Sequence, residues 1–215
     1  MFVGPWAVTP PRVVGAYSVA VFWFFVVVAG LIVIFGIWAI GLYNGLTRKR
    51  VRAQNSLSQI DVQLKRRCDL IPNLVESVKG YMAHERQTLE SVTAARAQAL
   101  QGLDALHEGA SRRGVISALA GHAATLDQLI GRLNARIEAY PDLKASANVL
   151  ALQEELSSTE NRIAFARQAY NDAVAELNTG ILVFPANLLA GPFGFVAMEL
   201  FTAAEGERAV PSVSI

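Results

Sequence analysis

A long run without charge near the N-terminus is the feature that most restricts this chain. No Asp, Glu, Lys or Arg occurs from Val13 to Thr47, and Val19–Leu42 is apolar almost throughout. As an α-helix, those 24 residues would extend about 36 Å, which exceeds the roughly 30 Å hydrocarbon core of a bilayer. The run predicts a transmembrane helix over residues 19–42.

A cleaved signal peptide is the alternative, and it fits less well. Its apolar region is usually about 7–15 residues long, with basic residues before it and a small-x-small cleavage site after it. Arg12 alone is basic ahead of the run, and residues 41–50 offer no convincing cleavage site. We therefore expect a retained anchor.

The charges that flank the anchor predict its orientation. Residues 1–47 contain one basic side chain, whereas residues 48–67 contain seven against one acidic side chain. Positive flanks tend to stay in the cytoplasm, so we expect a single-pass protein of the cytoplasmic membrane with its N-terminus outside. A basic collar, made of Arg48, Lys49, Arg50 and Arg52, would also attract anionic lipids, although a solvated helix start explains the same residues.

Beyond the anchor, apolar residues recur at helical spacing and no strand pattern is evident. Steps of three and four residues bury one side of a helix and expose the other. Four such series follow one another: Leu57–Ile71, Val75–Leu103, Leu119–Tyr140 and Leu152–Ile181. Because packing them side by side is the simplest way to bury them, the sequence predicts an all-α fold in which the anchor continues into an antiparallel four-helix bundle.

Prolines and glycines mark the expected breaks. At Pro72, either Asp69 caps a new helix or one continuous helix is kinked. The segment GASRRG, residues 109–114, predicts a turn between the second and third series. The segment YPDLKAS, residues 140–146, separates the third series from the fourth.

Residues of the kinds that make active sites are scattered. His84, His107 and His122 fit no zinc-ligand spacing, and no GxSxG motif surrounds a serine. The single cysteine, Cys68, lies on an apolar helix face and excludes an internal disulfide. We therefore expect no enzyme activity, no catalytic residue, no metal or other cofactor, and no nucleic-acid partner.

The densest polar run, residues 154–174, predicts a polar layer between helices. Its stripe of core positions is flanked by Glu160, Arg167 and Asn171, and the first series offers Asp61 and Arg66 on its own flanks. Such a layer would fix the register of the helices more than it would add stability. An active site is the sharper alternative, but no nucleophile or metal set accompanies these residues.

The uncharged stretch Leu177–Met198 has three interpretations. A second membrane span is disfavoured because Pro185 and Pro192, with neighbouring glycines, would leave backbone groups unsatisfied in lipid. A re-entrant or surface-lying membrane segment and a cap that folds back over one end of the bundle are both open. Four aromatic residues are candidates for the cap or for membrane or partner contact: Phe184, Phe193, Phe195 and Phe201.

These segments give the expected organisation of the chain. It comprises a short extracytoplasmic segment, a transmembrane helix, a cytoplasmic helical bundle, an apolar cap or membrane-contacting segment, and a flexible tail. Their expected ranges are 1–18, 19–42, 43–179, 180–201 and 202–215.

Several runs of this sequence closely resemble the bacterial LemA family, including SQIDVQLKRRCDLIPNLVESVKGYMAHERQTLESVTAARA, LQEELSSTENRIAFARQAYNDAVAELNT and FPANLLAGPFGF. The resemblance covers about Leu42 to Phe201, with a less typical part at Ala105–Ala120. It implies an N-terminal membrane helix followed by an antiparallel helical bundle, without an established enzyme activity. It also implies loose links to envelope organisation and signalling, and to magnetosome formation.

The leading functional hypothesis is a membrane-anchored, non-enzymatic scaffold at the cytoplasmic face of the membrane. It would contact the lipid bilayer, form a homo-oligomer and recruit membrane partners. The alternative is an accessory subunit of a membrane protease or signalling complex, and a catalytic role comes third.

Overall fold

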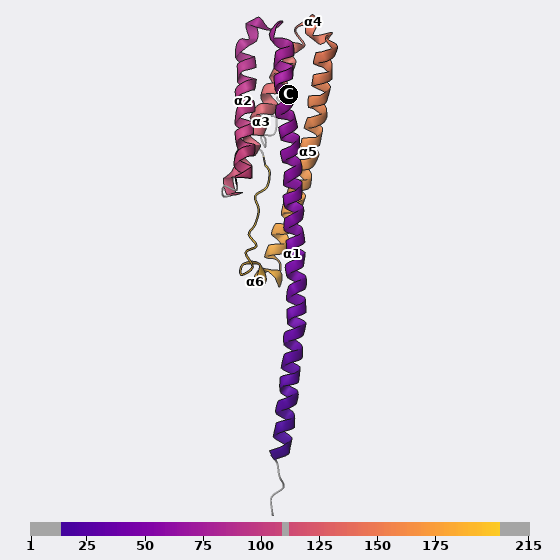
Figure 1. Ribbon diagram of the computed structural model, residues 1–215, viewed down its shortest axis with the longest axis vertical. Helices are drawn as coiled ribbons and strands as arrows, with labels where there is room; N and C mark the ends of the chain where they lie inside the picture. Colours follow the sequence, from indigo (N-terminus) through magenta and orange to yellow (C-terminus); the bar gives the residue numbers. More distant parts are fainter. Residues whose placement is uncertain (1–13, 109–111, 203–215) are drawn as a thin grey trace, which may run out of the picture. The chain divides into compact units, whose positions relative to one another are not determined.

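The computed structural model describes residues 14–108 and 112–202, and in them the chain is entirely helical apart from turns and one extended segment (Figure 1). The helices are α1 (Val14–Lys79), the 3₁₀ helix η1 (Ala83–Glu85), α2 (Arg86–His107), α3 (Arg112–Ile137), α4 (Pro141–Lys144), α5 (Ala147–Leu182) and α6 (Ala186–Ala190). The prediction of an all-α fold is confirmed over these residues. Of the expected segment 1–18, residues 1–13 lie outside the described residues and residues 14–18 begin α1, and the expected tail lies outside them from residue 203 onward.

The chain divides into two units, Met1–Asn44 and Gly45–Ile215, here called unit 1 and unit 2. In unit 1, the large apolar side chains of α1 between Val21 and Ile40 are exposed. Within the described residues, α1 is the one helix that is long and apolar enough to cross a membrane. The predicted anchor therefore lies on a helix whose large apolar side chains are mostly exposed over the described part of this unit.

Unit 2 is built around two hydrophobic clusters that the last part of α1 shares with α2, α3 and α5, which run alongside one another (Figure 1). The first cluster contains Cys68, Ile71 and Leu74 of α1, with residues of α2, α3, α4 and the start of α5. The second contains Leu57, Ile60 and Leu64 of α1, with residues of α2, α3 and the later part of α5. The buried positions follow the steps of three and four residues that define an amphipathic helix.

Pro72 does not interrupt α1, which continues to Lys79. The turn comes later, at Gly80–Met82, and neither of the alternatives considered at Pro72 predicted it. Met82 is completely buried in this turn, so the apolar stripe continues in phase from α1 into α2 and conceals the break. The second apolar series therefore spans two helices.

The C-terminal stretch folds back along α5 and does not form a second long apolar helix. The helix α5 ends at Leu182, the five-residue α6 follows, and a tight turn at residues 191–194 places Gly194 at φ +69°. A positive φ of this kind suits glycine because it has no Cβ. Residues 195–202, here called the strap, then leave the turn in an extended conformation.

Candidate functional site

An ionic layer crosses unit 2 between its two hydrophobic clusters. The side chain of Arg67 on α1 is 1% exposed, and it pairs with Asp127 on α3 and, at 2.8 Å, with Glu160 on α5. Leu64 belongs to one cluster and Cys68 to the other, so the arginine marks the boundary on α1. We call Arg67, Asp127 and Glu160 the Arg67 layer.

The Arg67 layer places a positive charge in the interior of unit 2, which costs free energy. A buried guanidinium loses its hydration, and only well-placed carboxylates restore part of that free energy. Both carboxylates remain partly exposed, with 24% of the Asp127 side chain and 56% of the Glu160 side chain accessible. The Nε atom of Arg67 is buried and has no hydrogen-bond partner among the described residues. A buried ion pair is weak evidence for stability, so the role of the layer in fixing the register of the helices stays a prediction.

Of the residues expected in a polar layer, Glu160 belongs to the Arg67 layer, whereas Arg66 does not. The Arg66 side chain is 48% exposed and pairs with Glu155 at the surface. One residue turns an α-helix by about 100°, and that turn places Arg67 inside. Asp61 faces α2 instead, where its Oδ2 lies 3.3 Å from Nε2 of His107.

The other two expected members, Arg167 and Asn171, hold the strap. The guanidinium carbon of Arg167 lies 5.3 Å from the centroid of the Phe201 ring. The side-chain amide of Asn171 accepts from the Phe201 N–H at 2.8 Å and donates to its carbonyl at 3.2 Å. Two polar residues of α5 thus bind the strap rather than the ionic layer.

Asn178 repeats this arrangement one step along the strap, and no pattern in the sequence indicated it. Its amide accepts from the Met198 N–H at 2.9 Å and donates to the Met198 carbonyl at 2.9 Å. Glu199 lies between the two strap residues that these amides bind, and its carbonyl accepts a hydrogen bond from the Tyr170 hydroxyl at 2.7 Å. We call Asn171 and Asn178 the asparagine clamp. Each binds backbone atoms of the strap, and backbone atoms leave no side-chain pattern in the sequence. The clamp could therefore be recognised only after the position of the strap was known.

Cys68 lies at the edge of the Arg67 layer and is completely buried. Burial raises the pKa of its thiol above the ordinary value, and the charge of Arg96 opposes only part of that rise. A buried thiol of raised pKa is a poor nucleophile, because the reactive species is the thiolate. The structure therefore gives Cys68 a packing role.

The basic collar lies against the end of α5 and the turn before the strap. Arg50 donates to the carbonyl of Gly194 at 2.6 Å, and its guanidinium carbon lies 4.4 Å from the centroid of the Phe195 ring. Lys49 and Arg52 both pair with Glu176, at 3.4 and 3.3 Å. Arg48 is exposed.

The four candidate aromatic residues divide into two pairs. Phe195 and Phe201 are 5% and 1% exposed, so they pack into unit 2. Phe184 and Phe193 are 78% and 52% exposed. One pair is therefore buried in unit 2 and the other is exposed.

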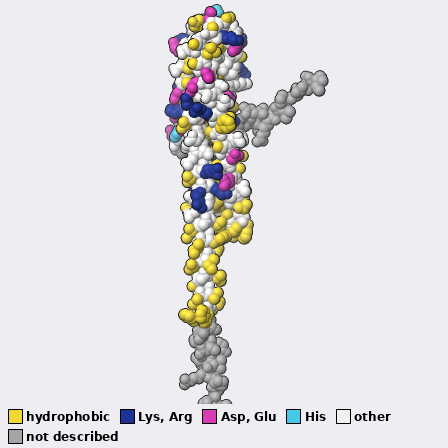
Figure 2. Space-filling model, turned by 90° about the vertical axis from the view of Figure 1, so that its right-hand side faces the viewer, with side chains coloured by type: hydrophobic (Ala, Val, Ile, Leu, Met, Phe, Trp, Pro, Cys, Tyr) yellow, Lys and Arg dark blue, Asp and Glu magenta, His cyan; other side chains and the backbone are white. Residues whose placement is uncertain are grey.

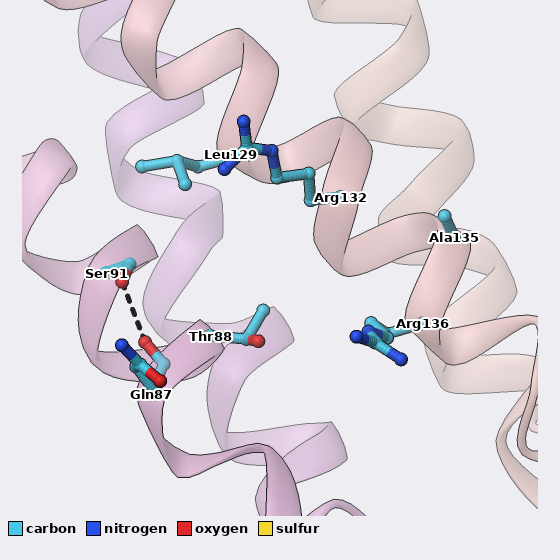
Figure 3. A pocket seen from close by; sticks show the side chains of 7 residues that line it. All are labelled: Gln87, Thr88, Ser91, Leu129, Arg132, Ala135 and Arg136. Atoms are coloured by element: carbon cyan, nitrogen blue, oxygen red, sulfur yellow. Dashed lines mark hydrogen bonds between the residues drawn. The ribbon is translucent and has the colours of Figure 1, made fainter.

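An open groove of about 560 Å³ lies between α2 and α3 (Figure 3). It is lined by Gln87, Thr88, Ser91, Leu129, Arg132, Ala135 and Arg136. Figure 3 shows the polar side chains of α2 on one side and the two arginines of α3 on the other. No group of three or more His, Cys, Asp or Glu side chains suited to a metal ion occurs in the described part of the chain.

Over the described residues, these features define the class of protein. It is all-helical, with one candidate membrane helix and a helical unit whose core is divided by an ionic layer. The LemA family model matches residues 56–215. The chain belongs to the LemA family, and the resemblance seen in the sequence is confirmed.

Named relatives agree with this assignment. The chain is 30% identical to "Protein LemA" of Metamycoplasma hominis over 185 residues, which cover 86% of this chain and 78% of that protein. It is 26% identical over 174 residues to magnetosome protein MamQ of Magnetospirillum gryphiswaldense and to MamQ 1 of Paramagnetospirillum magneticum, covering 74% of this chain. The match spans 64% of each magnetosome protein, slightly less than two thirds.

Proposed function

We propose that this protein is a membrane-anchored, non-enzymatic scaffold whose helical unit forms an antiparallel four-helix bundle and self-associates at the cytoplasmic face of the membrane. Membership of the LemA family and a candidate membrane helix support membrane association. None of the three relatives named above carries the name of an enzyme. The Arg67 layer supports a unit with a single fixed packing, as a scaffold requires.

One face of unit 2 carries the proposal of self-association. An open groove of about 370 Å³ runs between α1 and α5, and it is lined by Ser56, Gln59, Gln63, Arg162, Phe165, Ala166 and Ala169. The ring of Phe165 stands at its edge and is 73% exposed. The Oε1 atom of Gln63 is buried without a hydrogen-bond partner among the described residues. In a two-fold dimer, the exposed Phe165 ring of each copy would pack into the groove of the other copy against Ala166 and Ala169, beside the polar part of the lining.

A photo-crosslink in native membranes tests this face. Benzoylphenylalanine at position 165 should give a covalent dimer of this chain. The same group at Leu150, which is also on α5 and 49% exposed, is the matched control and should give none. Phe165→Ser should weaken the oligomer in mild detergent. A monomer at native expression levels, or adducts from position 150 alone, would overturn the proposal.

A second candidate function, an accessory subunit of a membrane complex, is favoured by the groove of Figure 3. Arg132 and Arg136 would suit an acidic segment of a partner protein, because guanidinium groups bind carboxylates in pairs of hydrogen bonds. One guanidinium nitrogen of Arg136 lies 3.7 Å from a carboxylate oxygen of Glu85, an ion pair longer than a hydrogen bond. Co-purification of a stoichiometric foreign subunit, lost in Arg132→Glu but kept in Arg162→Glu, would support this candidate over self-association.

A further inference from the structure

The turn that reverses the chain at the end of α5 exposes an unusually apolar surface. Six large apolar side chains of residues 182–196 are between 49% and 78% exposed: Leu182, Val183, Phe184, Leu188, Phe193 and Val196. We call this set the apolar tip. The sequence holds no charged residue from Leu177 to Met198, so no side chain of this segment offsets the exposure. Large exposed apolar patches of this kind mark interaction sites.

The apolar tip is held in place by specific contacts. Ala186 and Ala190 of α6 are buried, whereas Leu188 on the opposite side of α6 is 63% exposed. Arg50 holds the carbonyl of Gly194, and Asn178 fixes the backbone at Met198. Because unit 2 positions these side chains outward through such contacts, their exposure is a property of the fold.

Positive charge lies beside the apolar tip. Arg50 touches the turn of the tip directly, and a Cβ added to Gly180 would lie 3.4 Å from Cδ of Lys49. The basic collar has four positive charges, and Glu176 pairs with two of them. Figure 2 shows dark-blue Lys and Arg side chains beside a hydrophobic surface. Apolar side chains bordered by basic ones are typical of surfaces that enter the headgroup region of anionic bilayers.

The basic collar follows the predicted membrane span closely in the sequence. Arg48 follows the end of the predicted span, Leu42, by only six residues, and Arg52 follows it by ten. If α1 spans the bilayer, the collar belongs to the first residues that leave the hydrocarbon. Contact with a bilayer therefore explains three features together: the exposed apolar side chains, the basic collar, and the short stretch of sequence between the collar and the predicted span. A protein partner would explain the apolar side chains and the basic charge, but not their closeness to the span.

We propose that the apolar tip inserts into the headgroup region of the membrane, with the basic collar against anionic lipid headgroups. This contact is a second membrane attachment, separate from α1. It goes beyond the proposed scaffold function and does not depend on self-association through Phe165.

The test uses the full chain reconstituted in vesicles of phosphatidylcholine, with and without phosphatidylglycerol. Leu188→Cys carries an environment-sensitive fluorophore, and Cys68→Ala removes the native thiol. In anionic vesicles, we expect blue-shifted emission that is quenched by nitroxide-labelled acyl chains and protected from iodide. Ser157→Cys, on an exposed position of α5, is the matched control and should show the reverse.

Variants then separate the apolar and ionic parts of the contact. Phe184→Ser combined with Phe193→Ser should abolish the nitroxide quenching at position 188. Arg48→Gln combined with Arg52→Gln should reduce it to the level seen without phosphatidylglycerol. Phe165→Ser should leave it unchanged, which keeps this test independent of the scaffold proposal. Helicity measured by circular dichroism verifies that each variant is folded.

Two results would overturn the proposal. A label at position 188 that stays accessible to iodide would show that the tip remains in water. A label protected from both quenchers, increasingly so as the protein-to-lipid ratio rises, would show that a second copy covers the tip instead of lipid.

Discussion

Arg96 donates a hydrogen bond from Nε to the carbonyl oxygen of Cys68 at 2.7 Å, from α2 to α1. That carbonyl would normally accept from the N–H of residue 72, but residue 72 is a proline and has none. The arginine therefore satisfies the backbone group that the proline leaves open. A proline inside a helix is usually destabilising, and here a neighbouring helix compensates for part of that cost.

The first prediction is that Arg96 and Pro72 are energetically coupled. Arg96→Met should cost about 1–3 kcal/mol, because it leaves a partly buried carbonyl unsatisfied. In a Pro72→Ala background the same substitution should cost less, since an alanine at this position supplies the missing N–H. A double-mutant cycle from denaturant unfolding in micelles measures the difference. Pro141→Ala, at the first residue of α4, is the control background, and an equal cost in all three backgrounds would contradict the coupling.

The second prediction concerns the asymmetry of the Arg67 layer. Asp127→Ala should cost about 3 kcal/mol, the low end for breaking a buried pair, because Glu160 still partners the buried guanidinium. Arg67→Met should cost less, since the two partly exposed carboxylates can be hydrated instead. Arg66→Met is the surface control, with an expected cost below about 1 kcal/mol. Denaturant unfolding gives the order, and a larger loss for Arg67→Met than for Asp127→Ala would be inconsistent with it.

The third prediction follows from the raised pKa of Cys68. In the unfolded chain this thiol ionises at about pH 8.5, whereas in the folded chain it stays protonated to higher pH. Stability from the protonated thiol is thus complete below about pH 8.5 and is lost as the pH rises from there through the folded-state pKa. The free energy of unfolding should fall more steeply with alkaline pH in the wild type than in Cys68→Ala. Parallel slopes for the two proteins would refute this account of Cys68.

The fourth prediction concerns the asparagine clamp. Asn171→Ala should increase amide hydrogen exchange at Phe201, and Asn178→Ala should do so at Met198, because each loses its acceptor. Asn→Asp at either site keeps the acceptor, loses the donor and places a charge near a carbonyl, so protection should survive only in part. Asn161, exposed on α5, provides the control substitution. Unchanged exchange in both alanine variants would show that packing alone holds the strap.

The fifth prediction is the orientation of unit 2 in the cell. Ser157→Cys should resist an impermeant maleimide in intact cells and react after lysis. Cys68 is an internal reference, because its buried thiol should react only on unfolding. Labelling of position 157 in intact cells to the extent seen after lysis would reverse the orientation.

The hydrophobic pattern predicted the all-α fold well because burial on one face of a helix leaves a periodic record in the sequence. Residues such as Leu64, Ile130 and Ile163 lie at stripe positions and are buried. The same pattern hid the turn at Gly80–Met82, because Met82 keeps its place in the stripe while the backbone reverses. Periodicity reports which residues are inside and does not report chain direction.

The polar residues were harder to place for two physical reasons. Arg66 and Arg67 are adjacent, so their side chains differ only by a rotation of about 100° around the helix axis. Which of them enters the core depends on the position of its partner Asp127 on α3. Asn171 stands out in the sequence beside a stripe of core positions, but its partner is the backbone of the strap, which has no side-chain signature. Contacts between distant segments decide both cases.

The spacing within the asparagine clamp has a consequence for chain length. Asn171 and Asn178 are seven residues apart, about 10.5 Å and nearly two turns along a helix. Met198 and Phe201 are three residues apart, about 10 Å along an extended chain. The two lengths agree in this alignment, so one residue inserted or deleted between Met198 and Phe201 should release one of the two amide pairs. The clamp thus fixes the number of residues between its two points of contact. This part of the strap should therefore tolerate substitution of its exposed side chains far better than any insertion or deletion.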